Sequence, residues 1–99
     1  MFVALSKFVI ANEMEGAIKD AFQARPHKVD DAPGFIRLDV LSPEEHPKEI
    51  WLLTYWNDRR SFEEWHKSHL YLESHSGIPK GLKLVPGSAK LQFFDHVAS

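Results

Sequence analysis

Cysteine is absent from the 99-residue sequence, which excludes a disulfide framework and any metal site built on thiolates. The formal net charge is −2 and no block of like charges stands out, so the basic stripe typical of nucleic-acid binding is missing. No apolar run approaches the ~20 residues that span a bilayer, and residues 1–5 lack the charged segment of a signal peptide. We therefore expect a cytoplasmic protein whose partners include neither a membrane nor a nucleic acid.

Motifs that bind nucleotide cofactors or build a hydrolytic site are also absent. The sequence contains no GxGxxG, no Walker phosphate loop and no GxSxG. No pair of Asp or Glu residues has a spacing that suits general acid and base catalysis. If the chain catalyses a redox reaction, its electrons are therefore expected to come from an external donor.

The elements that the sequence does contain follow the order of a single α+β domain spanning residues 1–99. Apolar and β-branched runs predict strands at 2–10, 35–41, 49–56 and 91–97. Asn12, followed by Glu15 in a capping-box pattern, is expected to begin one helix, and Asn57-Asp58 a second. Right-handed connections then place both helices on one face of a four-stranded antiparallel sheet, which is a ferredoxin-like β-α-β-β-α-β fold.

The first strand is apolar on both of its faces, and this pattern predicts a second chain. If the helices cover the face with Phe2 and Phe8, the opposite face still carries Val3, Leu5 and Val9. Soluble monomers rarely expose a large apolar patch of this kind. Two copies that stack their sheets would cover it, so we expect a homodimer.

Large apolar side chains are expected to line the space between the helices and the sheet, where this architecture usually places a ligand. They are Phe8, Phe22, Phe62, Trp65 and Leu72. The alternative is that these residues only pack against one another in the hydrophobic core. The two roles are compatible, because residues that line a pocket also belong to the core. Trp65 and His75 together are more informative, because a wide aromatic beside a neutral imidazole suits a flat aromatic or porphyrin ligand. Taken singly, Trp65 is a typical core residue and His75 a typical helix-end residue.

Two further groups of polar side chains have weaker support. His66, His69 and His75 resemble a metal cluster, but His75 lies off the helix face of the other two unless the helix breaks between them. A solvated His66 and a His69 at the edge of the core are the preferred explanation. Arg25 and Arg37 match the geometry of ligand carboxylates such as porphyrin propionates, although arginines of this kind are more often solvated.

Several pieces of the sequence together resemble a known family over nearly the whole chain. These pieces are the opening strand Phe2-Val3-Ala4-Leu5-Ser6, the turn Ala32-Pro33-Gly34-Phe35, the stretch Thr54-Tyr55-Trp56, and Phe62, Trp65, Ser68 and His75 beyond it. The chain resembles the antibiotic biosynthesis monooxygenase domain family of dimeric α+β barrels. From Trp56 to His75 it is most similar to the iron-regulated haem-degrading monooxygenases, and the spacing of Trp65 and His75 is the more specific signal.

The resemblance implies roles for individual residues. His75 would ligate the haem iron, Trp65 would press on the porphyrin and help to ruffle it, and haem would be both cofactor and substrate. In the haem-degrading members an asparagine stands on the first strand where this chain has Ser6. The serine hydroxyl would either hold a water near the oxygen or mark a protein that does not turn haem over. Lys7 points to the opposite strand face and is a poor substitute.

Three functions therefore remain open. The first is a haem-degrading monooxygenase. The second is a cofactor-independent monooxygenase of an aromatic, quinone-forming substrate, which the aromatic lining and the missing asparagine favour. The third is a dimer that binds haem or another planar ligand without turning it over. The sequence leaves open whether the loop at 76–88 closes over such a ligand.

Overall fold

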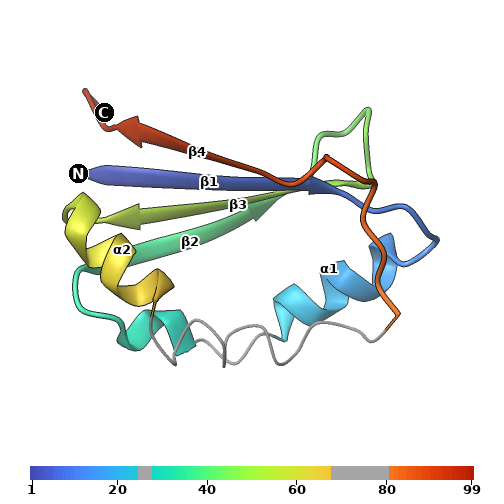
Figure 1. Ribbon diagram of the computed structural model, residues 1–99, viewed down its shortest axis with the longest axis horizontal. Coiled ribbons are helices and arrows are strands. Elements are labelled where there is room, and N and C mark those ends of the chain that lie inside the picture. Colours follow the sequence, from blue (N-terminus) through green and yellow to red (C-terminus); the bar gives the residue numbers. More distant parts are fainter. Residues whose placement is uncertain (25–27, 68–80) are drawn as a thin grey trace.

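The computed structural model describes residues 1–24, 28–67 and 81–99 of the chain (Figure 1). Within these residues the elements are β1 (Phe2–Val9), α1 (Glu15–Gln23), the short 3-10 helix η1 (Lys28–Asp31), β2 (Phe35–Leu41), β3 (Glu49–Trp56), α2 (Arg59–His66) and β4 (Lys90–Asp95). No helix in these ranges is both long enough and apolar enough to cross a membrane.

The four strands form one sheet in the order β2-β3-β1-β4, and each neighbouring pair is antiparallel. Both helices lie on the same side of this sheet, α2 near one end and α1 near the other (Figure 1). We call this side the helix face and the other side the open face. The predicted element order and the predicted sheet are confirmed.

The helix face carries two separate groups of packed side chains. The α2 cluster consists of Phe2, Ala4, Val29, Ala32, Trp56 and Phe62, with Phe35, Leu38 and Trp65 packed against it. The α1 cluster consists of Ile10, Ile18 and Ile50, with Phe8, Phe22, Val40, Leu52 and Leu82 packed against it. The first cluster is mostly aromatic and the second mostly aliphatic, and they share no member.

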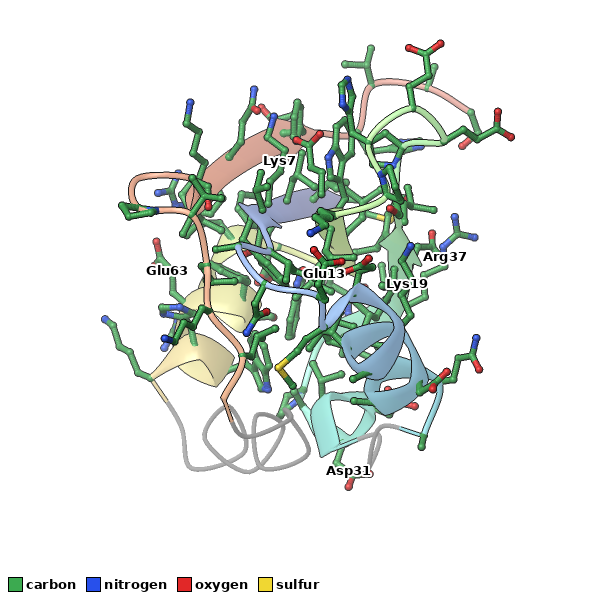
Figure 2. The ribbon with its side chains drawn as sticks, turned by 90° about the vertical axis from the view of Figure 1, so that its right-hand side faces the viewer. Lys7, Glu13, Lys19, Asp31, Arg37 and Glu63 are labelled. Carbon is green, nitrogen blue, oxygen red and sulfur yellow. The ribbon has the colours of Figure 1, made fainter. Side chains whose placement is uncertain are left out.

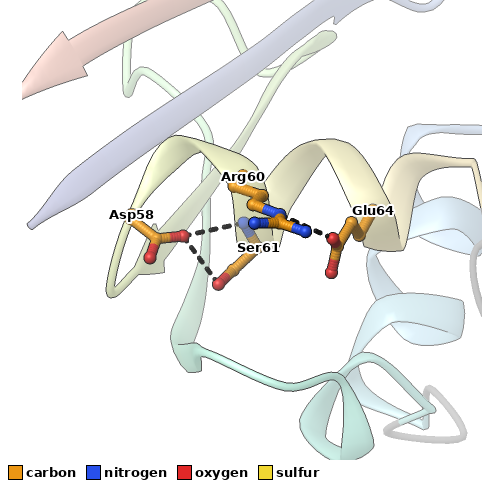
Figure 3. A network of polar contacts seen from close by, with 4 residues as sticks. All are labelled: Asp58, Arg60, Ser61 and Glu64. Atoms are coloured by element: carbon orange, nitrogen blue, oxygen red, sulfur yellow. Dashed lines mark hydrogen bonds and ion pairs between the residues drawn. The ribbon is translucent and has the colours of Figure 1, made fainter.

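The start of α2 is held by the cap that the sequence predicts and by contacts with the turn before β2. Asp58 adopts an extended backbone at the N-cap, and its Oδ1 accepts hydrogen bonds from the backbone N–H and the hydroxyl of Ser61, both at 2.8 Å (Figure 3). Gly34 has φ +82° and lies so close to Ser61 that a Cβ would collide with the serine side chain. The Asn57 N–H also donates to the Gly34 carbonyl at 2.8 Å, so the turn before β2 is fastened to the start of α2.

The start of α1 differs from the prediction, and Asn12 is not its cap. The N-cap residue is Met14, which provides no side-chain hydrogen bond, and the helix begins at Glu15. The Asn12 side chain instead donates to the Gly81 carbonyl at 2.9 Å. A partner distant in the sequence therefore holds the Asn12 NH2 group, and the Asn12 Oδ1, which a cap would use as acceptor, forms no hydrogen bond with a described residue.

Residues 81–88, the second part of the predicted 76–88 loop, run beside the end of β1. Val85 N–H donates to the Val9 carbonyl and Ala11 N–H to the Lys83 carbonyl, both at 2.8 Å, and Ile10 forms an isolated bridge with Leu84. These bonds end β1 at Val9, one residue earlier than predicted. Residues 76–80 lie outside the described part of the chain. The last strand runs from Lys90 to Asp95, slightly before the predicted 91–97.

Candidate functional site

Ser6 lies on the helix face of β1, between the two clusters. On the same face of this strand, Ala4 belongs to the α2 cluster and Phe8 packs against the α1 cluster. Ser6 is half-buried, and its neighbours across the sheet are Leu52 on β3 and Leu91 on β4. Its hydroxyl forms no hydrogen bond with any residue that the structure describes. The Ser6 hydroxyl is thus a polar group without a described hydrogen-bond partner, set in an otherwise apolar surface.

The wall on the α2 side is built from stacked aromatic rings. Trp65 projects from α2 and packs on Trp56 with a centroid distance of 5.4 Å and on Phe62 at 6.3 Å. Trp56 is completely buried, and its indole N–H has no hydrogen-bond partner among the described residues. Phe62 also contacts Phe2 at 5.8 Å and Phe93 at 5.6 Å. Trp65 is therefore held by rings that are themselves well packed.

The wall on the α1 side contains the other predicted lining residues. Phe8 and Phe22 are half-buried and pack against Ile18 and Ile50, both of which are fully buried. The predicted lining set therefore divides into two groups, with Phe62 and Trp65 on one side of Ser6 and Phe8 and Phe22 on the other. Leu72, the fifth predicted member, lies outside the described residues.

The predicted iron ligand, His75, also lies outside the described residues, as do His69 and Arg25. His66 is exposed and stacks on Phe62 with a centroid distance of 5.5 Å and an interplanar angle of 29°. No group of three His, Asp or Glu side chains that would hold a metal ion occurs in the ranges the structure describes. The three-histidine cluster stays a prediction.

Arg37, one of the two arginines considered as partners of ligand carboxylates, lies on the open face and therefore does not meet a ligand on the helix face. A bulge between Phe35 and Arg37 shifts the alternation, so Arg37 pairs with Tyr55 on the open face. There its guanidinium covers the Tyr55 ring at 4.5 Å and forms an ion pair with Asp39 at 3.1 Å. Hydrogen bonding to Tyr55, helped by the charge of Asp39, raises the pKa of Arg37 above its ordinary value.

Lys7 also lies on the open face, as predicted, with its ammonium 5.1 Å from the centroid of the Trp51 ring (Figure 2). The helix face near Ser6 therefore receives charge from neither Lys7 nor Arg37. An apolar planar molecule would meet side chains there that match it.

Sequence reasoning missed Arg59, the first residue of α2. Its guanidinium lies 4.7 Å from the Phe93 ring and 5.9 Å from the Phe2 ring, and its Nε donates to Glu63 at 2.8 Å. The spacing of four between Arg59 and Glu63 was the available signal, because such pairs meet on one helix face. Arg59 thus ties α2 to the edge strand β4 next to the aromatic wall.

The sequence model of the antibiotic biosynthesis monooxygenase family matches residues 1–76. The chain belongs to this family. A relative from Shouchella clausii, described as a heme-degrading monooxygenase, is 30% identical over 70 residues. The match covers 69% of this chain and 64% of that relative, so the chain spans less than two thirds of the relative's length.

Solved structures of family members share the fold. A heme-degrader from Mycobacterium tuberculosis, solved with two hemes bound in its active site, matches with a TM-score of 0.81 and 20% identity over 100% of this chain and 98% of that one. A cofactor-independent oxygenase from Streptomyces nogalater matches with a TM-score of 0.75 and 13% identity over 99% and 94%. The predicted fold, a ferredoxin-like α+β domain of the dimeric α+β barrel class, is confirmed.

Proposed function

We propose that this family member binds haem on the helix face of its sheet and degrades it, using molecular oxygen and an external electron donor. The observation that carries the proposal is the face of packed rings, Trp65 on Trp56 and Phe62, that stands opposite the aliphatic α1 cluster on the helix face. The relative described as a heme-degrading monooxygenase supports the choice of haem over other planar ligands.

The described residues fit the faces of a porphyrin. A porphyrin is flat, wide and apolar on its faces, and aromatic rings offer both area and stacking to such a ligand. In the proposal Trp65 presses on one region of the ring, since Trp56 and Phe62 behind it prevent it from yielding. Phe8 and Phe22 contact the ring from the α1 side. Bound haem would supply the iron at which oxygen reacts, and it is also the substrate that is consumed.

Two polar residues complete the proposed site. His75 is proposed as the iron ligand on the basis of the family resemblance, because a neutral imidazole ligates haem iron. Ser6 is proposed to hold a water on the β1 side, since its hydroxyl is a donor and an acceptor that no described neighbour uses. The surrounding apolar walls exclude other water, which strengthens each remaining hydrogen bond.

The proposal includes a homodimer formed through the open face. Val3 and Leu5 lie on this face but are buried within the single chain, so the expectation that they form an exposed apolar patch is wrong. The exposed apolar side chains of this face include Leu41, at 47%, and Phe94, at 40%. A second sheet stacked here would cover Leu41 and Phe94 without touching the helix face, so each protomer keeps its own ligand site.

The experiment that tests the haem proposal is a titration of the purified protein with hemin, followed at the Soret band, and then addition of ascorbate in air. Binding followed by bleaching supports degradation, and binding without bleaching supports a protein that only holds haem. His75→Ala should abolish the Soret shift, whereas His66→Ala, the matched control on exposed α2 surface, should leave it unchanged. Failure of the wild type to bind hemin would refute the proposal.

A second candidate is cofactor-independent oxygenation of an electron-rich aromatic substrate. The observation that favours it is Ser6 itself, which is shorter than the asparagine of the haem-degrading members and offers one hydroxyl in place of an amide. Ser6→Asn separates the two functions. If the serine limits haem turnover, the variant bleaches haem faster than the parent. If the protein does not use haem, the variant changes neither binding nor bleaching.

A further inference from the structure

The part of the helix face that lies over β4 is left largely uncovered. Ala4 and Ser6 on β1 pair with Phe93 and Leu91, so these two β4 side chains leave the sheet toward the helix face. Neither is among the buried members of the two clusters, and Phe93 remains 38% and Leu91 49% exposed. We call these two side chains the β4 strip. The strip continues the apolar surface around Ser6 as far as the edge strand of the sheet.

Arg59 stands at the α2 end of the β4 strip, and its guanidinium is held from two sides. The Cζ atom lies 4.7 Å from the centroid of the Phe93 ring and 5.9 Å from that of Phe2, and Nε donates to Glu63 at 2.8 Å. These contacts fix the orientation of the planar group. Its two Nη groups form no hydrogen bond with any residue in 1–24, 28–67 or 81–99. Donors that can bind a carboxylate in a bidentate way are therefore unused.

The charges around Arg59 leave its guanidinium available to an anion. Glu63 occupies only the Nε donor, and the two side chains are 59% and 47% exposed, so solvent screens their attraction. Asp95 lies at the same end of the strip, as the register partner of Phe2, but it forms no ion pair with Arg59. A carboxylate held over the Phe93 ring would lose part of its water, and a charge-assisted hydrogen bond is stronger there. These surroundings favour a carboxylate that arrives on an apolar molecule.

We propose that Arg59 binds a carboxylate at the edge of the planar ligand, and that the ring of this ligand lies over Ser6 and the β4 strip. The inference rests on the haem binding of the proposed function and adds the contact that orients the ring, with one propionate directed toward the start of α2. Leu91 and Phe93 are two positions apart, about 7 Å along the strand. The edge of a porphyrin and its propionate arm together span such a length.

The combination of the strip and the guanidinium defines the class of ligand. A small inorganic anion would use the charge of Arg59 but would gain nothing from Leu91 and Phe93. A planar ring that covers both side chains removes exposed apolar surface from water, and its carboxylate uses the free Nη donors. The ligand is therefore a broad, mostly apolar ring system with a carboxylate on an arm at its edge. Arg59 takes the role that the sequence suggested for Arg25 or Arg37, of which Arg37 lies on the open face.

Two porphyrins that differ only in their carboxylates test the contact without relying on iron. Metal-free protoporphyrin IX carries free propionates, and its dimethyl ester has the same ring without their charge. Quenching of tryptophan fluorescence gives the dissociation constant of each. Arg59→Gln should raise the constant for the acid roughly tenfold or more, because a hydrogen bond to a charged group is lost. It should leave the constant for the ester nearly unchanged. Arg59→Lys keeps the charge without the bidentate geometry and should give an intermediate loss for the acid.

The matched control is Arg60→Gln on the same turn of α2. Arg60 pairs with Glu64 at 2.9 Å with the same spacing of four, so this variant removes an equal charge and a similar ion pair. Its side chain is 86% exposed and contacts no aromatic ring among the described residues. The dissociation constants of both porphyrins should therefore stay close to those of the wild type. Circular dichroism of all variants verifies that they are folded.

The outcomes separate this inference from the proposed function. Hemin titrated into Arg59→Gln should bind more weakly with an unchanged Soret maximum, because the proposed iron ligand is untouched. A wild type that binds hemin while Arg59→Gln binds both porphyrins as tightly overturns the carboxylate contact and leaves haem binding intact. Equal losses for the acid and the ester, or equal losses in Arg59→Gln and Arg60→Gln, also overturn it. A wild type that binds neither hemin nor protoporphyrin overturns both proposals.

Discussion

The two ends of the helix face are built by different means. At the α2 end, aromatic rings pack on one another, Asp58 caps the helix, and Gly34 brings the preceding turn against Ser61. At the α1 end the helix has no side-chain cap, and Ile18 is its one fully buried residue. The ligand proposed over Ser6 would therefore meet packed rings and a capped helix on one side, and an uncapped helix held by aliphatic contacts on the other.

Each type of wall has its own physical basis. Rings such as Trp56 and Phe62 have few rotatable bonds, and their edge-to-face contact, with centroids 5.8 Å apart, resists displacement. Among the described residues, the α1 helix rests on the sheet mainly through isoleucine and phenylalanine side chains, and apolar packing of this kind imposes less directional constraint than a hydrogen bond. Ligands of different size are expected to move α1 and to leave Trp65 in place.

The largest expected effect separates the two clusters by their contribution to stability. Trp56→Ala should lower the free energy of unfolding by ~3–5 kcal/mol, because it empties the centre of the aromatic cluster. Ile18→Ala, at the fully buried position of α1, should cost ~2–5 kcal/mol and fall below Trp56→Ala. Urea denaturation measures both. A larger loss of unfolding free energy for Ile18→Ala would contradict this ranking, since the aliphatic cluster would then contribute more to stability than the aromatic one.

Gly34 allows the turn-to-helix contact of the α2 end to be tested separately. Gly34→Ala should destabilise the protein by ~1–3 kcal/mol through its positive φ, and further because the new Cβ meets Ser61. Gly87→Ala is the matched control, since Gly87 has φ +76° but open space around it. The two variants differ in the collision alone. Equal losses of stability would show that a Cβ at Gly34 is accommodated beside Ser61 at no cost.

A smaller effect concerns the cap of α2 and its response to acid. Hydrogen bonds from the backbone and the hydroxyl of Ser61 lower the pKa of Asp58 below its ordinary value of 3.8. Because the folded state holds the carboxylate in its charged form, this contribution is complete above pH 3.8 and is lost as the pH falls through the lowered pKa. Asp58→Ala should lower the Tm by a few degrees at neutral pH.

Asp58→Asn is the control for charge, because asparagine also caps helices. It should retain most of the neutral-pH stability and flatten the fall of Tm between pH 4 and pH 2, the range set roughly by the acidity of aspartate. Thermal unfolding followed by circular dichroism across this range measures the difference. If Tm fell between pH 4 and pH 2 as steeply in Asp58→Asn as in the wild type, the charged Asp58 carboxylate would not be the source of the acid sensitivity.

The smallest effects come from the two arginines that begin α2. Arg60 is exposed and pairs with Glu64 at 2.9 Å (Figure 3), so Arg60→Gln should cost less than ~0.5 kcal/mol. Arg59 has the same spacing to Glu63 and also covers Phe93, so Arg59→Gln should cost ~0.5–1 kcal/mol. Denaturant titration in low salt resolves the two. Equal costs would show that the contact with Phe93 does not help to fasten α2.

Local patterns predicted much of the fold and part of the site. Alternation along β1 placed Ser6 and Phe8 on one face and Lys7 on the other, and the structure agrees. The Asp58 cap was predicted from neighbouring residues alone. Asn12 was assigned wrongly by the same reasoning, because its partner, the Gly81 carbonyl, is 69 positions away. A local capping pattern carries no information about so distant a competitor.

The sequence by itself determined the element order, the strand faces and the start of α2, since these depend on steps of two, three and four residues. Tertiary structure alone decided which cluster each lining residue joins, the bulge that turns Arg37 to the open face, and the register that sets Lys7 opposite Lys90. The physical reason is that register and packing arise from pairings between distant segments, and a one-residue shift in such a pairing reverses every face.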